Sequence, residues 1–237
     1  MAEIIQYASG MSNGFFIKGS KGVVCVDTGD LEGKDVALKF FEEANIKPED
    51  VILIIVTHYH PDHVRNINAL KELTNAPVLI HETEADALQN GADPDKTTAA
   101  RNEFGRKLQE MFAQMEMPPQ PFIKCDVDIA MKGEEMDLSE WGLDGVLLHT
   151  PGHSRGSICV VLNNGDAIVG DVFSSNGSEK VGMMPFFKDP DQPYEAAQES
   201  VQKLLDRGAK TIYSGHGGPY TREYVQEKLD EERNSVK

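Results

Sequence analysis

The heptapeptide THYHPDH, residues 57–63, follows directly on the apolar run VILIIV, residues 51–56. An uninterrupted apolar run of this length is typical of a strand that is buried on both faces. Pro61 and Asp62 suit the first turn of a helix, which we expect over residues 61–73. The heptapeptide is therefore predicted to form a loop between a buried strand and a helix. It carries four candidate metal ligands: His58, His60, Asp62 and His63.

The segments on either side alternate between strand and helix patterns. The predicted strands are 3–8, 14–19, 22–29, 51–58, 76–82, 126–131, 143–149, 157–163, 166–171 and 211–217, and the predicted helices are 33–46, 61–73, 82–90, 95–117, 194–208 and 221–233. This order favours an α/β (α+β) fold in which two sheets pack face to face with helices outside them. Because no linker or low-complexity segment interrupts the chain, residues 1–237 are expected to form a single domain.

Composition narrows the class of partner. The chain has 237 residues and a formal charge of −16, with an isoelectric point near 4.8. Such a negative field disfavours nucleic acid and anionic lipid, so we expect neither a nucleic-acid nor a membrane partner. The three cysteines Cys25, Cys125 and Cys159 are scattered, and the sequence shows no signal peptide or long apolar span. These features predict a cytoplasmic protein without a disulfide framework.

Three further candidate ligands lie in glycine-bearing turns after predicted strands. His153 lies in HTPGHSRGS, Asp171 in IVGDVFSS and His216 in YSGHGGP. Imidazole and carboxylate groups that converge from separate loops are typical ligands of zinc and similar ions. Seven such groups exceed what one tetrahedral ion needs. They are about right for two ions that share a carboxylate.

These motifs occur in the order found in the metallo-β-lactamase superfamily, which the chain resembles. THYHPDH resembles the HxHxDH motif of that family, HTPGHSRGS its third-histidine motif, VVCVDTG (23–29) its early strand ending in Asp, IVGDVF its bridging-aspartate motif and SGHG its final-histidine motif. The resemblance implies a four-layer αββα sandwich. It places His58, His60 and His153 on a first metal, Asp62, His63 and His216 on a second, and Asp171 between them.

The resemblance also implies a reaction. Two zinc ions, with iron or manganese as alternatives, would hold a bridging hydroxide that attacks a small ester, thioester or lactone. Asp62 is the expected catalytic residue, orienting the nucleophile or passing a proton to the leaving group. The alternative is an iron dioxygenase of the same fold, similar to persulfide dioxygenases, with one iron on His58, His153 and Asp171.

Other residues have candidate roles near such a site. Asp27 is a candidate acceptor that fixes a ligating imidazole, or it closes a turn. His149 is either close to the metal site or structural, and His81 is expected to be structural. Arg65 either binds a substrate carboxylate or is solvated. The apolar loop 181–187 and the helix bearing Met111, Met115 and Met117 are candidates to line the site for a substrate with an apolar portion, and that helix is also a possible homodimer contact.

Overall fold

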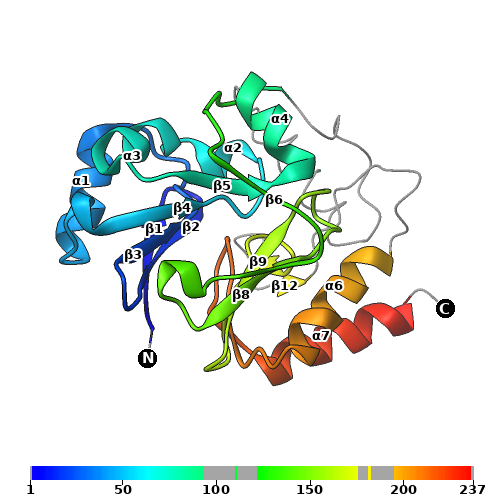
Figure 1. Ribbon diagram of the computed structural model, residues 1–237. Helices are drawn as coiled ribbons and strands as arrows, with labels where there is room; N and C mark the ends of the chain where they lie inside the picture. Colours follow the sequence, from blue (N-terminus) through cyan, green and yellow to red (C-terminus); the bar gives the residue numbers. More distant parts are fainter. Residues whose placement is uncertain (1, 93–109, 111–121, 176–180, 183–194, 236–237) are drawn as a thin grey trace.

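A computed structural model describes residues 2–92, 110, 122–175, 181–182 and 195–235. Its first sheet has six strands in chain order, from β1 to β6 (Figure 1). They are β1 Glu3–Ser9, β2 Ser12–Lys18, β3 Val23–Val26, β4 Val51–Ile55, β5 Val78–His81 and β6 Ile129–Met131. β1, β2 and β3 pair antiparallel, and β3 to β6 pair parallel. The parallel part contains β4, the strand that leads into the histidine-rich heptapeptide.

The second sheet has the order β14-β13-β10-β9-β8-β7. Its strands are β7 Glu135–Asp137, β8 Gly145–His149, β9 Ile158–Leu162, β10 Asp166–Ile168, β13 Thr211–Tyr213 and β14 Tyr220–Thr221. β10 pairs parallel with β13, whereas its other neighbour β9 runs antiparallel to it. β10 and β13 therefore end at the same edge of the sheet, where Asp171 and His216 follow. A separate pair, β11 Ser174–Ser175 and β12 Val181–Gly182, lies beyond Asp171.

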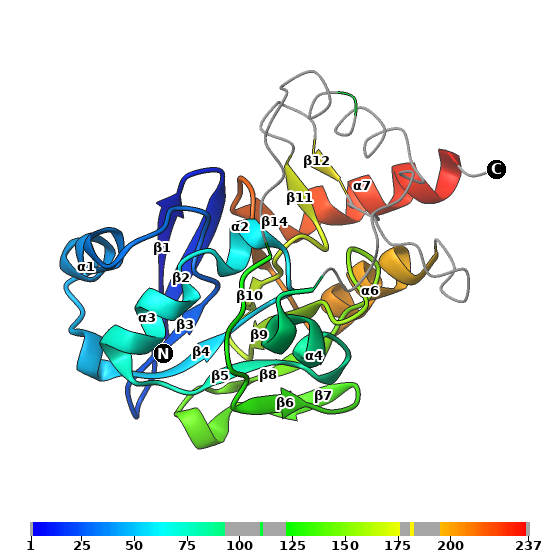
Figure 2. The ribbon, with the colours of Figure 1, turned by 90° about the horizontal axis from the view of Figure 1, so that it is seen from above.

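Helices cover the outer faces of both sheets (Figure 2). They are α1 Lys34–Glu43, α2 Pro61–Val64, α3 Ile67–Thr74, α4 Glu82–Asn90, α6 Glu195–Asp206 and α7 Arg222–Ser235, with 3-10 turns at Pro48–Asp50 and Ser139–Trp141. Phe41 of α1, Leu70 of α3 and Leu88 of α4 pack on the first sheet. Leu204 of α6 and Leu229 of α7 pack on the second.

Alternation along the strands builds the core between the sheets. In β2, Phe15 and Ile17 enter the core shared with the second sheet, while Phe16 enters the core beneath α1. In β4, Leu53 and Ile55 also enter the core between the two sheets. Each sheet thus buries both faces, one against the other sheet and one against helices. The predicted four-layer αββα sandwich is confirmed.

The predicted helix over residues 61–73 is wrong in one respect, because it is two helices with a break at Arg65 and Asn66. The Asn66 side chain accepts a hydrogen bond from Gly33 N at 2.8 Å and donates to Gly33 O at 3.2 Å. Its backbone N–H donates to Thr28 Oγ1 instead of continuing the first helix. These contacts to the segment after β3 turn the chain and fix where α2 ends.

Several short strands were not predicted. β11 and β12 lie in a segment expected to be loop, and β7 and β14 have only three and two residues. Apart from residue 110, the predicted helix over residues 95–117 lies outside the described residues, as do residues 183–187 of the expected apolar loop. None of the helices described is both long and apolar enough to span a bilayer.

Candidate metal centre

The ends of four strands bring the candidate ligands together. The heptapeptide follows β4, the His153 loop joins β8 to β9, Asp171 follows β10 and His216 follows β13. Ligand atoms from these segments form three overlapping groups, each with its atoms within 4.8 Å of one another. The groups are His58–His60–His153, His58–His63–Asp171 and Asp62–His63–His216. All seven predicted residues therefore lie in one cluster.

The first group is a triangle of imidazole nitrogens. His58 Nε2 lies 3.0 Å from His60 Nδ1 and 3.1 Å from His153 Nε2, and the last two atoms are 2.8 Å apart. His58 and His153 are buried, while His60 is half-buried. Burial, and then the neighbouring His63 and His60, hold the pKa of His58 well below its usual value. The neutral imidazole that results is the form that ligates a metal ion.

The group Asp62–His63–His216 combines one carboxylate with two imidazoles. His216 Nε2 lies 3.1 Å from Asp62 Oδ2, and His63 Nε2 lies 3.7 Å from the same oxygen. His63 Nε2 is buried and makes no hydrogen bond. A buried polar atom without a partner is costly. Its orientation toward the carboxylates of Asp62 and Asp171 therefore fits a ligand of a metal cation.

Asp171 lies between the His58–His60–His153 group and the Asp62–His63–His216 group. Its Oδ1 is 3.6 Å from His63 Nε2, and its Oδ2 is 3.2 Å from His216 Nε2 and 3.7 Å from His153 Nε2. The side chain is only 4% exposed. One oxygen of Asp171 thus faces a histidine of each group, and the other faces His63.

The electrostatics of the cluster favour positive charge. Burial would raise the pKa of Asp62, but His63 and His216 hold that pKa below its ordinary value. Burial likewise opposes a charged His216, yet Asp171 and Asp62 raise the pKa of His216 to about 10. The carboxylates thus hold protons on the nearby imidazoles when no metal compensates them. Divalent cations would supply the same compensation.

Comparison with known proteins places this cluster in a family. The sequence model that describes the metallo-beta-lactamase superfamily matches residues 8–216 of this chain. The chain belongs to the metallo-β-lactamase superfamily. It is 31% identical over 210 residues to the probable metallo-hydrolase MJ0888 of Methanocaldococcus jannaschii, covering 87% of each chain. It is 26% identical to the human acyl-coenzyme A thioesterase MBLAC2 over 242 residues, covering 89% of this chain and 75% of the relative.

A solved structure has a similar fold. The protein TTHA1623 in a di-iron-bound form matches with a TM-score of 0.63 and 21% identity, over 92% of this chain and 94% of that one. At this identity the match supports the fold alone. Family and relatives together make the chain a metal-dependent hydrolase of the superfamily.

Asp27 makes hydrogen bonds that hold the residues of the candidate metal centre in place. It is fully buried, and its carboxylate accepts hydrogen bonds from Thr57 N, Thr57 Oγ1 and His63 Nδ1 at 2.7–2.8 Å. Because the Thr57 hydroxyl gives its proton to Asp27, His58 Nδ1 is the donor in its 3.1 Å contact with that hydroxyl. His58 and His63 therefore both present Nε2 to the centre. Of the two predicted roles for Asp27, the structure favours fixing an imidazole.

The β1–β2 turn makes contacts that the sequence did not reveal. His216 Nδ1 donates to the Met11 carbonyl at 2.7 Å, which leaves Nε2 facing the centre. Ser12 Oγ donates to the Asp62 carbonyl at 2.6 Å. Met11 and Ser12 carry no motif, and the bond from His216 goes to a main-chain oxygen, so no residue pattern could have marked them.

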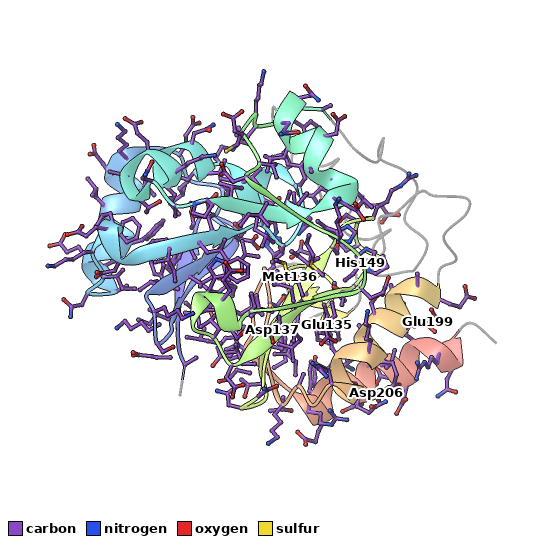
Figure 3. The ribbon with its side chains drawn as sticks, in the orientation of Figure 1. Glu135, Met136, Asp137, His149, Glu199 and Asp206 are labelled. Atoms are coloured by element: carbon purple, nitrogen blue, oxygen red, sulfur yellow. The ribbon has the colours of Figure 1, made fainter. Side chains whose placement is uncertain are left out.

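Three predicted residues lie outside the cluster. His81 and His149 stack on each other, with ring centroids 3.9 Å apart and planes within 8°. His149, labelled at the end of β8 in Figure 3, donates from Nε2 to the Arg155 carbonyl. His81 accepts from Thr83 N at the start of α4, which agrees with its predicted structural role. Arg65 has a buried Nη2 without a hydrogen bond, and its role in binding substrate stays a prediction.

Proposed function

We propose that the chain is a two-metal hydrolase that cleaves a small ester, thioester or lactone. The observation that carries the proposal is the placement of Asp171: its Oδ2 faces both His153 and His216, and its Oδ1 faces His63. His58, His60 and His153 would hold one ion, and Asp62, His63 and His216 the other. We propose zinc as the native metal, since imidazole and carboxylate donors suit it. The di-iron form of TTHA1623 makes iron the main alternative.

Two bound cations would supply a nucleophile at neutral pH and an electrophile for the carbonyl oxygen. The side chains of the centre then have separate tasks. Asp62 is 25% exposed, against 4% for Asp171, so it is the carboxylate that faces incoming substrate. Because Ser12 fixes its main chain, its side chain is positioned to orient a nucleophile and to receive or deliver a proton. Asp171 is restricted to ligation by its burial.

A thioester is the substrate class that we favour. The human relative named an acyl-coenzyme A thioesterase aligns along 89% of this chain. An acyl thioester also supplies an acyl chain, which can be the apolar portion, and a thiolate leaving group. We propose a small-molecule substrate with an apolar portion on this basis.

Elemental analysis together with a substrate panel tests the proposal. The protein would be purified without added metal, and zinc, iron, manganese and nickel would be measured per chain. About two zinc ions per chain, with turnover of acyl thioesters or esters, is the expected result. About one iron per chain would instead support the dioxygenase alternative, if the protein hydrolyses none of these substrates and consumes dioxygen when a persulfide is added. No metal after reconstitution would refute both.

A further inference from the structure

Glu84 is a buried carboxylate that the proposed chemistry does not use. It lies in the first turn of α4, in the segment ETEADALQN, between the exposed residues Glu82 and Asp86. Its exposed fraction is 0%. Glu84 shares the buried face of α4 with Ala87 and Leu88. A carboxylate is normally solvated, and a buried one needs hydrogen bonds to offset desolvation. The partners of Glu84 therefore indicate its role.

Those partners come from the two loops that carry the first group of histidines. Glu84 Oε2 accepts a hydrogen bond from Tyr59 N at 2.6 Å, and Tyr59 lies between His58 and His60. Glu84 Oε1 accepts from Gly156 N at 2.8 Å and from Ser154 Oγ. Ser154 is the residue that follows His153. One carboxylate thus joins both loops at residues adjacent to all three ligands of the first metal position.

The local sequence is built to allow this contact. A Cβ on Gly156 would lie 2.7 Å from Thr83 Oγ1 and 2.8 Å from Glu84 Cγ, so only glycine lets the loop approach α4 this closely. Ser157 accepts from Ser154 N at 3.1 Å and holds the turn that presents Ser154. The N-terminal turn of α4 also favours a negative charge at Glu84.

A backbone hydrogen bond between the two segments acts at a different point. Ile158 N donates to Thr57 O, which joins the two strands just before the loops diverge toward the ligands. Thr57 orients the ring of His58. Glu84 contacts both loops beyond that link, where the separation of His153 from His58 and His60 is set.

We infer that Glu84 is a positioning residue for the first metal, holding the His58–His60 loop and the His153 loop at the spacing that one ion requires. This inference rests on the proposed two-metal function. It assigns a different task from that of Asp27, which fixes the ring of His63 directly and that of His58 through Thr57. Loss of Glu84 should therefore weaken the first metal position selectively.

Glu84→Gln tests the inference with little change in size. An amide retains one acceptor and turns the other into a donor, which then faces Tyr59 N–H or the Gly156 N–H. We expect zinc affinity at the first position to fall about 10–100-fold, as for other groups that support metal ligands. The second position should keep its affinity. Zinc titration against a chelating dye gives both affinities, and anomalous diffraction at limiting zinc assigns them to the two positions.

Matched variants separate positioning from folding. Glu82→Gln makes the same chemical change at an exposed residue of the same helix and should leave both affinities unchanged. Gly156→Ala displaces the carboxylate without altering its charge and should reproduce the selective loss. Ser154→Ala removes one of the three donors and should give a smaller loss, which keeps the test decisive if Glu84→Gln fails to fold.

The possible outcomes distinguish this inference from the proposed function. Wild-type protein with two zinc ions and an unchanged first affinity in folded Glu84→Gln would overturn the inference alone. Equal weakening of both positions would also overturn it, because that result indicates a general structural role. A wild-type protein with one zinc, on the three histidines, that Glu84→Gln weakens would support the inference and overturn the two-metal proposal. Failure of wild-type protein to bind zinc would overturn both.

Discussion

Asp27 shows how one buried residue can select the tautomer of a ligand. Its φ of 58° is in the left-handed region, where Asp and Asn are tolerated better than most residues. From that position the carboxylate accepts hydrogen bonds from His63 Nδ1 and from the backbone N–H and the hydroxyl of Thr57. The charge on Asp27 also makes the imidazole of His63 a stronger ligand.

Asp27→Asn should therefore weaken metal binding without straining the backbone. An Asn accepts the same φ but presents one N–H₂ group toward donors that need an acceptor. We expect zinc affinity to fall about 10–100-fold, with the position that includes His63 most affected. Zinc titration with a chelating dye measures the change. Asp35→Asn, on the exposed surface of α1, is the control. An affinity equal to that of wild type would show that Asp27 only closes the turn.

His81 gives a prediction about pH and stability. Burial lowers the pKa of His81, and the stacked His149 lowers it further, while the Gly133 carbonyl, Glu82 and Glu134 act in the opposite direction. In an unfolded chain His81 takes up its proton at the usual histidine pKa of about 6.5, but the folded chain resists protonation. The unfolded state thus binds more protons below that pH. Stability is complete above about pH 6.5 and falls as the pH decreases through the lowered pKa.

His81→Asn should reduce this dependence, because Asn does not titrate and retains an acceptor for the start of α4. The free energy of unfolding, measured in urea at neutral pH and at about pH 5.5, should fall less in the variant than in wild type. The metal-site histidines contribute equally to both proteins, so the comparison isolates His81. An identical fall in the two proteins would show that His81 does not resist protonation.

At the scale of elements, the turn after β13 must pass very close to the ligands. A Cβ on Gly215 would lie 2.4 Å from Asp171 Oδ1 and 2.6 Å from His63 Cε1. Both contacts are shorter than real Cβ contacts, and both partners belong to the candidate centre. The glycine before His216 is thus a requirement of the site as much as of the turn.

Gly215→Ala should therefore impair catalysis more than folding. Moving Asp171 and His63 by about 1 Å is enough to cost roughly 100-fold in rate. Hydrolysis of whichever ester or thioester wild-type protein cleaves, with far-UV circular dichroism on the same samples, measures both effects. Asp35→Ala, at an exposed residue of α1, is the control for a substitution away from the centre. A variant with native spectrum and native rate would mean that the ligands tolerate displacement.

The sequence predicted those elements whose hydrophobic pattern is strong. The apolar runs of β4, β8 and β9 identified strands, and glycine-bearing motifs placed ligands at the ends of strands. β11 and β14 have only two residues each, too few for any period to be visible. The break between α2 and α3 depends on Asn66 contacting Thr28 and Gly33, which lie more than thirty residues earlier. Local pattern cannot carry such information.

The same distinction applies to the candidate site. The seven predicted ligands stand in motifs, so residue type and spacing sufficed to bring them together. Glu84 was missed because a glutamate is normally solvated, and its hydrogen-bond partners come from loops that lie far away in the chain. His81 and His149 are histidines near the same loops, yet they pair with each other and not with the cluster.

At the scale of the whole molecule, the candidate centre joins the two sheets. His58, His60, Asp62 and His63 follow β4 of the first sheet, while His153, Asp171 and His216 follow strands of the second. Each proposed metal position draws ligands from both sheets, and Asp171 contacts both positions. Bound metal would therefore link the two sheets at one edge of the core that they share.

Metal binding should accordingly stabilise the entire fold. A ligand that binds only the folded state stabilises it by about 4 kcal/mol when its free concentration is about 1,000 times its Kd. For a chain of this length such a gain raises Tm by roughly 8–16 °C. Calorimetry of wild-type protein with zinc, and again after chelation, should show one transition that shifts by this amount. One transition in both states would also support the predicted single domain of residues 1–237.

Asp171→Asn distinguishes stabilisation by zinc bound at the centre between the two sheets from stabilisation by zinc bound elsewhere. The variant keeps the apolar core and the five histidines of the candidate centre, but it loses the charge that faces both metal positions. Its Tm in zinc should approach that of chelated wild type, since a bridging ligand has been weakened at both ions at once. Glu82→Gln should behave as wild type, because Glu82 is exposed on α4. If zinc raised the Tm of Asp171→Asn as much as that of wild type, the stabilising ion would be bound elsewhere, and a centre shared by the two sheets would not explain the stability of the fold.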